Sequence, residues 1–295
     1  MPPRSYATPE GFRQALETRV RAAAGSSGMG RFRQVLVYDR LLARVFQHLG
    51  DRVVAKGGVV LELRLERART TRDVDIHLRG PSDGLLAELR AAGRLDLGDF
   101  LAFEIEPDRE HPTIAGDGVV YEGLRFRVQG QLAGKAYGVP FGLDVGFGDV
   151  LTEPPEMIDG SDFLAFVGVQ RARHRVYPCV VHIAEKLHAY TLPRKRENSR
   201  VKDLPDIALL AQVGRLDADR LRAALQATFA FRKTQPLPSS LPAPPSSWEP
   251  VYERMAREDE LPWRTLAELL VAVRAFIDPV LSGATGTWEP ERWSW

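Results

Sequence analysis

The sequence has little of three things: cysteine, long apolar runs, and an excess of charge of one sign. Its single cysteine, Cys179, cannot form a disulfide within the chain, so an oxidising compartment is not indicated. Cys179 lies in an apolar run, which favours a buried structural thiol over a reactive one. No stretch reaches the roughly eighteen uninterrupted apolar residues of a spanning helix, and the N-terminal residues lack the apolar core of a signal peptide. We therefore expect a cytoplasmic protein that contacts no membrane.

The balance of charge excludes a uniformly basic or acidic protein. Forty Lys and Arg residues against thirty-nine Asp and Glu residues leave a net charge of +1 over 295 residues. A nucleic-acid surface would therefore have to come from local clustering of basic side chains. Hydrophobic residues make up 44% of the chain and charged residues 27%, which is the usual range for a folded globular protein.

The order of the expected elements predicts an α+β fold. Apolar residues recur at helical spacing over residues 8–24 and 32–49, and a Gly–Ser segment at 25–28 separates these two helices. Alternating or short apolar runs bounded by Gly and Pro predict strands at residues 51–56, 73–78, 100–106, 124–132 and 138–146. Further helices are expected at residues 59–67, 82–94, 181–191, 204–213, 217–231 and 264–277. The chain thus divides into a mixed α and β part, residues 1–165, and a mainly helical part, residues 166–295.

The densest polar segment of the sequence contains a pair of carboxylates. Asp73 and Asp75 stand at positions i and i+2 of a predicted strand, which places both side chains on one face, roughly 7 Å apart along the chain. Two oxygen ligands at this spacing suit Mg²⁺, and two like charges this close need a cation between them. The alternative is a strand that simply exposes two carboxylates to solvent, so the pair becomes a candidate site only through its context.

Two glycines and a third aspartate supply that context. Lys56, Gly57 and Gly58 end one predicted strand and open a helix, where glycine lets the backbone approach a phosphate and the helix N-terminus favours negative charge. The same glycines could also form an ordinary helix-start turn. Asp144 lies between glycines on a later predicted strand, where it is either a third metal ligand or a surface aspartate.

In this order, the glycines, the Asp-x-Asp pair and the later aspartate resemble the nucleotidyltransferase superfamily related to DNA polymerase β. Four ordered motifs narrow the resemblance to the AbiEii/AbiGii toxin family, which includes the mycobacterial MenT toxins. These motifs are YDRLLARVF (38–46), KGG with RTTRDVD (56–58 and 69–75), AEKLHA (184–189) and RVKDLPDI (200–207). The resemblance covers most of the chain. It implies a nucleotidyltransferase-fold mixed sheet, with the helical C-terminal part completing the active-site cleft.

The resemblance implies roles for individual residues. Asp73 and Asp75 would bind the metal and align the nucleoside triphosphate (NTP), while Lys186 matches a helical lysine that contacts nucleotide phosphates. The expected catalytic residues are Asp73, Asp75, Lys186 and Asp206, and the expected metal ligands, for Mg²⁺ or Mn²⁺, are Asp73, Asp75 and Asp144. The expected nucleotide-binding residues are Lys56, Gly57, Gly58, Arg72, Lys186, Lys202 and Asp203.

Two positions depart from the family pattern or carry a further expectation. Lys202 stands where relatives usually have Arg, so the charge is kept but the bidentate fork is lost. Thr71 stands where some relatives carry a serine that the antitoxin phosphorylates. A phosphate there would add about −1.5 to −2 charges beside the carboxylates and block metal and nucleotide binding.

One stretch of the sequence is strongly basic. Residues 171–202 contain nine Lys and Arg residues but only two Asp and Glu residues, a balance of +7. A basic stretch is often a solvated face, but beside a site that handles triphosphates an RNA backbone is the better partner. The expected RNA-binding residues are Arg171, Arg173, Arg175, Arg194, Lys195 and Arg196.

The expected reaction is transfer of a nucleoside monophosphate from an NTP to the 3′ end of tRNA, which blocks translation. The implied partners are tRNA, an NTP and a cognate antitoxin protein. A second hypothesis keeps the chemistry but changes the acceptor, as in a protein-AMPylating or small-molecule nucleotidyltransferase; the basic stretch argues against a cationic small molecule. A third hypothesis is a catalytically inactive binding module, against which the intact acidic residues argue.

Overall fold

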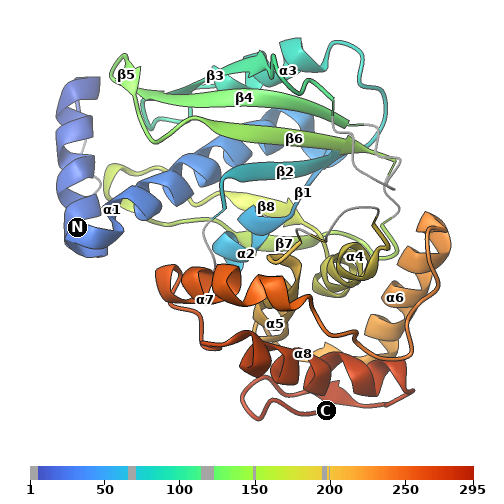
Figure 1. The fold of residues 1–295 in the computed structure, drawn as a ribbon. Helices are drawn as coiled ribbons and strands as arrows, with labels where there is room; N and C mark the ends of the chain where they lie inside the picture. Colours follow the sequence, from blue (N-terminus) through green and yellow to red (C-terminus); the bar gives the residue numbers. More distant parts are fainter. Residues whose placement is uncertain (1–5, 66–70, 114–122, 149–150, 195–197, 199) are drawn as a thin grey trace.

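The computed structural model describes residues 6–65, 71–113, 123–148, 151–194, 198 and 200–295. It shows a mixed α+β fold in which a twisted sheet lies above a group of helices (Figure 1). The strands are β1 (Val53–Lys56), β2 (Asp73–Leu78), β3 (Leu101–Pro107), β4 (Gly123–Leu132), β5 (Lys135–Ala136), β6 (Phe141–Phe147), β7 (Glu156–Asp159), β8 (Arg173–Val176), β9 (Leu216–Asp217) and β10 (Thr287–Trp288). The helices are α1 (Pro9–Leu49), α2 (Gly58–Arg64), α3 (Leu85–Gly93), α4 (Cys179–Thr191), α5 (Asp203–Ala211), α6 (Ala218–Arg232), α7 (Glu249–Glu258) and α8 (Leu266–Leu281).

The main sheet is mixed, as the sequence predicts. Its strand order is β3-β4-β6-β2-β1-β8-β7, with β5 paired to β4. The β2–β6 and β1–β8 pairs are parallel, and the remaining pairs are antiparallel. Each strand of the centre has two different faces: Val74 and Ile76 of β2 are fully buried in one hydrophobic cluster with Leu41 of α1. Asp73 and Asp75 therefore lie on the opposite face, away from α1.

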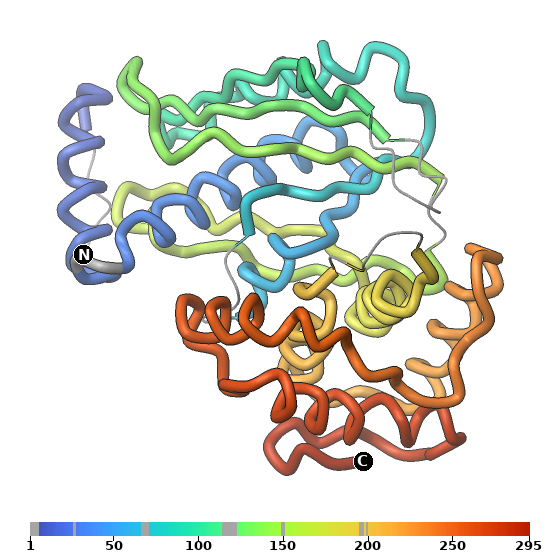
Figure 2. The backbone as a smooth tube through the Cα atoms, viewed as in Figure 1, coloured from blue at the N-terminus to red at the C-terminus, as the bar shows by residue number. Residues whose placement is uncertain are grey.

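Helix α1 has the predicted break, but its second arm begins earlier than predicted. The sequence predicts two helices, at residues 8–24 and 32–49, with a stop at residues 25–28, and the structure has a non-helical Gly25 within the element Pro9–Leu49. Gly25 has a φ of 64°, which glycine adopts without steric cost, so the chain turns and resumes its helix at once. Figure 2 shows the two arms of α1 at a wide angle, the second running along the sheet.

The helices α4 to α8 form a second hydrophobic cluster beneath the sheet. Its members include fully buried residues of α4, α5, α6 and α8, and also Val54 of β1 and Leu61 of α2. The first cluster ends along the chain at Val176 and the second takes over at Tyr177. The boundary proposed at 165/166 therefore falls between β7 and β8, two paired strands of one sheet. Within the described residues, no helix combines the length and the apolar character needed to cross a membrane.

Candidate active site

The carboxylates of β2 meet side chains from both neighbouring strands. In the antiparallel β1–β2 pair Lys56 is opposite Asp75, and in the parallel β2–β6 pair Asp144 is opposite Asp75. Residues paired in this way point to the same face of the sheet. The structure therefore brings Asp73, Asp75, Asp144 and Lys56 together, as the sequence predicts for the candidate site.

Two glycines make room for the two carboxylates. A Cβ atom on Gly57, at the turn from β1 to α2, would overlap the Asp75 carboxylate, and Gly57 also has a φ of 70°. A Cβ atom on Gly142, opposite Asp73 on β6, would come within 2.5 Å of Asp73 Oδ1. The sequence predicts close approach of a phosphate at Gly57. The structure shows that the nearest group is the Asp75 carboxylate itself.

Asp144 has a partner that the sequence analysis did not identify. Arg125 lies opposite Asp144 in the antiparallel β4–β6 pair. Its Nε donates to Asp144 Oδ1 over 2.7 Å and its Nη2 donates to Asp144 Oδ2 over 2.6 Å, a bidentate ion pair. The alternation of charged and apolar residues in 123–132 places Arg125 on a polar face, but the pairing depends on the register of two strands.

The site concentrates three carboxylates on one face of the sheet, of which Asp73 is exposed, Asp75 is partly buried and Asp144 is buried. Burial, and then the nearby Asp144, raise the pKa of Asp75 to about 6, while Lys56 and Lys186 oppose this rise. Burial is also the largest cause of the raised pKa of Asp73. Raised carboxylate pKa values mean that the folded chain disfavours the ionised form of Asp73 and Asp75, which a bound cation would stabilise. Asp73 and Asp75 therefore fit a divalent cation, whose oxygen preference matches their carboxylates.

The helical part contributes a lysine held by two aspartates. Lys186 Nζ of α4 lies 3.0 Å from Asp203 Oδ1 and 2.8 Å from Asp206 Oδ2, both on α5. The side chains of Asp203 and Asp206 are 3% and 0% exposed, and that of Lys186 is 14% exposed. The Lys186 ammonium also acts on β2, because its charge lowers the pKa of Asp75. The charge of Lys202 likewise lowers the pKa of Asp73.

Thr71 is buried beside the pair, whereas Arg72 is exposed. The Thr71 side-chain hydroxyl donates to the Asp73 carbonyl over 3.2 Å, and the Thr71 N–H donates to Glu62 Oε1 over 2.8 Å. Only 7% of Thr71 is exposed. The Thr71 hydroxyl is therefore engaged by the backbone of β2 and little exposed to solvent.

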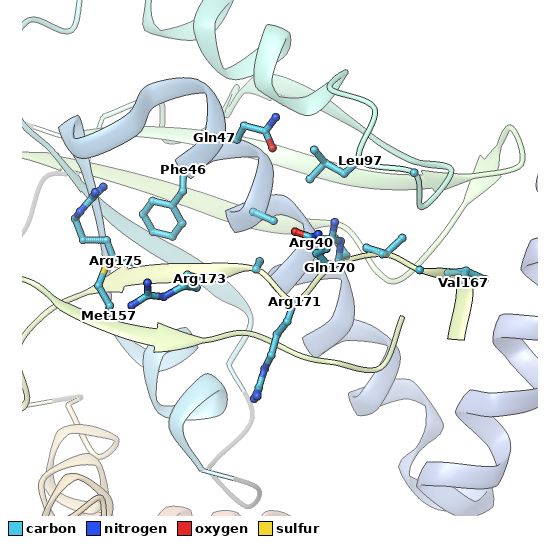
Figure 3. Close-up of a pocket in the computed structure, with 15 residues that line it drawn as sticks. Arg40, Phe46, Gln47, Leu97, Met157, Val167, Gln170, Arg171, Arg173 and Arg175 are labelled. Carbon is cyan, nitrogen blue, oxygen red and sulfur yellow. The ribbon is translucent and has the colours of Figure 1, made fainter. Parts of the chain in front are cut away.

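Three of the basic side chains predicted to bind RNA lie in or just before β8, beside the edge strand β7. Arg171, Arg173 and Arg175 line a hollow of about 590 Å³ together with Phe46 and Gln47 of α1 (Figure 3). β1 separates their strand, β8, from β2, so the structure does not bring these arginines together with the carboxylates. Arg194 follows the end of α4, and Lys195 and Arg196 lie outside the described residues.

Comparison with solved structures supports the fold. The nucleotidyltransferase toxin MenT4 of Mycobacterium tuberculosis is 18% identical and superposes with a TM-score of 0.55, covering 95% of this chain and 92% of MenT4. JHP933 from Helicobacter pylori is 16% identical with a TM-score of 0.46, covering 84% of this chain and 94% of JHP933. No curated protein sequence matches at a significant level.

The sequence itself matches a family model over most of its length. The model describes the nucleotidyl transferase AbiEii toxin of type IV toxin–antitoxin systems, and it matches residues 40–274. This range contains both the β2 carboxylates and the Lys186 cluster. The chain therefore belongs to the AbiEii family of nucleotidyltransferase toxins.

Proposed function

We propose that this toxin is a magnesium-dependent enzyme that transfers a nucleoside monophosphate from an NTP to the 3′ end of tRNA and so blocks translation. The observation that carries the proposal is the Asp73–Asp75 pair on one face of β2, with Lys56 of β1 and Asp144 of β6 opposite Asp75 and with the charge of Lys186 acting on Asp75. In the reaction, the acceptor hydroxyl oxygen bonds to the α-phosphorus and the bond to the bridging oxygen of the β-phosphate breaks. Pyrophosphate leaves, and the hydroxyl proton passes to solvent.

The chain's own groups have separate tasks in this reaction. Asp73 and Asp75 would hold Mg²⁺, which would supply Lewis-acid chemistry when bound. Lys56 and Lys186 offset the charge of the triphosphate, and Asp203 and Asp206 fix the Lys186 ammonium in place. This division explains why a lysine on a mainly apolar helix is paired with two buried aspartates.

The remaining nucleotide-binding and RNA-binding roles are also proposals. We propose that Gly58, at the N-terminus of α2, lies close to the triphosphate, and that Arg72 and Lys202 line its path. Arg171, Arg173, Arg175 and Arg194, with Lys195 and Arg196, would hold the RNA backbone away from the reacting end. The cognate antitoxin is the expected protein partner of a type IV toxin, and Thr71 is the position at which a phosphate would block the carboxylates.

The direct test measures label transfer from each of four α-³²P NTPs to total tRNA, with Mg²⁺ or with EDTA. Wild-type protein should label tRNA in Mg²⁺ alone, and Asp73→Ala should lose labelling. Asp83→Ala removes an exposed carboxylate soon after β2 and should label as wild type does. Absence of tRNA labelling with every NTP would refute the tRNA proposal, and label on protein instead would establish AMPylation.

A further inference from the structure

The third carboxylate of the site is already engaged by an arginine. Both oxygens of Asp144 accept hydrogen bonds from Arg125, at 2.7 and 2.6 Å, and only 9% of Asp144 is exposed. A bidentate guanidinium–carboxylate pair is among the strongest polar contacts in proteins. A divalent cation on the same oxygens would lie next to a permanent positive charge, which opposes its binding.

A metal site made of Asp73 and Asp75 alone needs no contribution from Asp144. Within the described part of the chain, no group of three or more Asp, Glu, His or Cys side chains is arranged to hold a metal ion. A Mg²⁺ site built from one or two carboxylates and completed by phosphate oxygens and water needs no third protein carboxylate. Asp73 and Asp75 meet that requirement without Asp144.

Arg125 lies on the face of the sheet that carries Asp75. The registers place Arg125, Asp144 and Asp75 side by side across β4, β6 and β2 on one face of the sheet. Asp144 takes two of the five N–H donors of Arg125, and 35% of the Arg125 side chain is exposed. The guanidinium therefore keeps donors for a further anion while Asp144 holds its orientation.

We propose that Arg125 is a catalytic residue that contacts the triphosphate, and that Asp144 is a positioning residue that holds Arg125 rather than a ligand of the metal. The inference rests on the proposed nucleotidyl transfer. Fixed donors aimed at a phosphate on which charge develops stabilise the transition state, and a guanidinium anchored by a carboxylate is fixed before the substrate arrives. Asp144 thus acts on the reaction only through Arg125.

The first arm of the test measures metal binding alone, so it does not depend on transfer. Binding of Mn²⁺ is titrated by electron paramagnetic resonance for wild type, Asp75→Asn, Asp144→Asn and Arg125→Lys. Asp75→Asn should lose Mn²⁺ binding, whereas Asp144→Asn and Arg125→Lys should bind as wild type does. These two variants keep the size and polarity of the replaced side chains, and thermal melting checks that they fold. Loss of Mn²⁺ binding in Asp144→Asn would make Asp144 a ligand and overturn the inference.

The second arm measures the anion. Tripolyphosphate with Mn²⁺ is titrated into wild type, Arg125→Ala, Asp144→Ala and the double variant, because this probe requires no knowledge of the base. Arg125→Ala and Asp144→Ala should weaken binding to the same extent, and the double variant should be no weaker than either single one, because both remove the same contact. Arg220→Ala breaks an exposed bidentate pair with Glu153 far along the chain and should change nothing. Additive losses would show that Asp144 acts independently of Arg125.

The third arm measures transfer itself. Arg125→Ala and Asp144→Ala should each lower kcat/KM by about 10²–10³-fold, the usual cost of removing one fixed donor at a developing oxyanion. If the wild type transfers no nucleotide to any acceptor, the proposed function fails while the two binding arms still decide the roles of Asp144 and Arg125. Full transfer by Arg125→Ala would overturn the catalytic role.

Discussion

Lys186 shows how a single side chain ties the two parts of the protein together. A lysine on a largely apolar helix usually extends its ammonium to solvent. Here the ammonium is 14% exposed and lies within 3.0 Å of two aspartates of α5. The carboxylate whose pKa it lowers, Asp75 of β2, lies more than one hundred residues earlier in the chain. The protonation of Asp75 on the sheet therefore depends on how the aspartates of α5 hold Lys186 of α4.

His188, one half-turn further along α4, should make the free energy of unfolding depend on pH. Burial, and then the nearby Arg232 and Arg194, lower the pKa of His188 to about 4. Because this pKa lies below the usual value of 6.5, the neutral ring stabilises the fold above pH 6.5, and that contribution is lost as pH falls towards 4. Urea unfolding of wild type should show a loss of about 1–2 kcal/mol between pH 7 and pH 5 from this residue.

The control for this prediction is His188→Gln, which keeps a donor for the Thr234 hydroxyl, 2.8 Å from His188 Nε2. Its unfolding free energy should fall less steeply over the same range of pH. Equal slopes for the two proteins would show that another group governs the loss in acid.

Individual residues also show how far the sequence could predict the site. The spacing of Asp73 and Asp75 predicts a shared face because it depends only on the local period of a strand, and the β2 strand bears this out. The Arg125–Asp144 pair could not be predicted in the same way. It depends on which residues of β4 and β6 stand opposite each other, and the spacing within each strand does not fix that register.

At the scale of elements, the turn from β1 to α2 requires glycine at position 57 because the Asp75 carboxylate lies against it. Gly57→Ala would add both the strain of a positive φ and an overlap with Asp75. Gly50→Ala adds the strain alone, because Gly50 has a φ of 61° and open space around its Cα. Each substitution should cost about 1 kcal/mol or more of stability from strain. Only Gly57→Ala should also lose Mn²⁺ binding and transfer.

Strand β8 and the residues just before it provide a second prediction at this scale. If Arg171 and Arg173 hold an RNA backbone, replacing either by Ala should weaken tRNA binding for all sequences alike and reduce the slope of log K against log salt by about 1. Filter binding at several salt concentrations measures this slope. Arg215→Ala, which removes another exposed arginine, should leave the slope unchanged. An unchanged slope in both the Arg171→Ala and the Arg173→Ala variants would show that these arginines do not contact the RNA backbone.

Elements also differ in how well their boundaries could be predicted. The strand predicted at 124–132 is observed as Gly123–Leu132, because Gly and Pro punctuation and alternation act locally. The stop predicted at 25–28 is confirmed at Gly25, whose backbone is not helical, but the second helix begins before residue 32, because one glycine is enough to turn the chain. Burial of Leu16 and Leu36 in one hydrophobic cluster stabilises both arms of the helix around the kink.

At the scale of the whole molecule, the C-terminal residues close the helical part. Trp288 is fully buried, packs against the Phe276 ring at 4.8 Å and donates its indole N–H to the Ala211 carbonyl over 2.9 Å. Trp288→Ala should therefore lower the free energy of unfolding by about 3–5 kcal/mol. Guanidinium unfolding followed by circular dichroism measures the loss. Trp295→Ala, which removes a partly exposed ring, should cost less, and equal costs would contradict this account.

Strand β1 belongs to both halves of the protein at once. Val53 and Ala55 face the cluster of α1, Val54 faces the cluster of the helical part, and Lys56 ends the strand opposite Asp75. A single strand thus separates the two hydrophobic clusters, so a change in the packing of the helices can displace the residues of β1 that lie beside Asp75. Partial unfolding of the helices on warming should therefore abolish nucleotide transfer before the sheet unfolds. A partner that loosens those helices would inhibit the toxin without contacting a carboxylate.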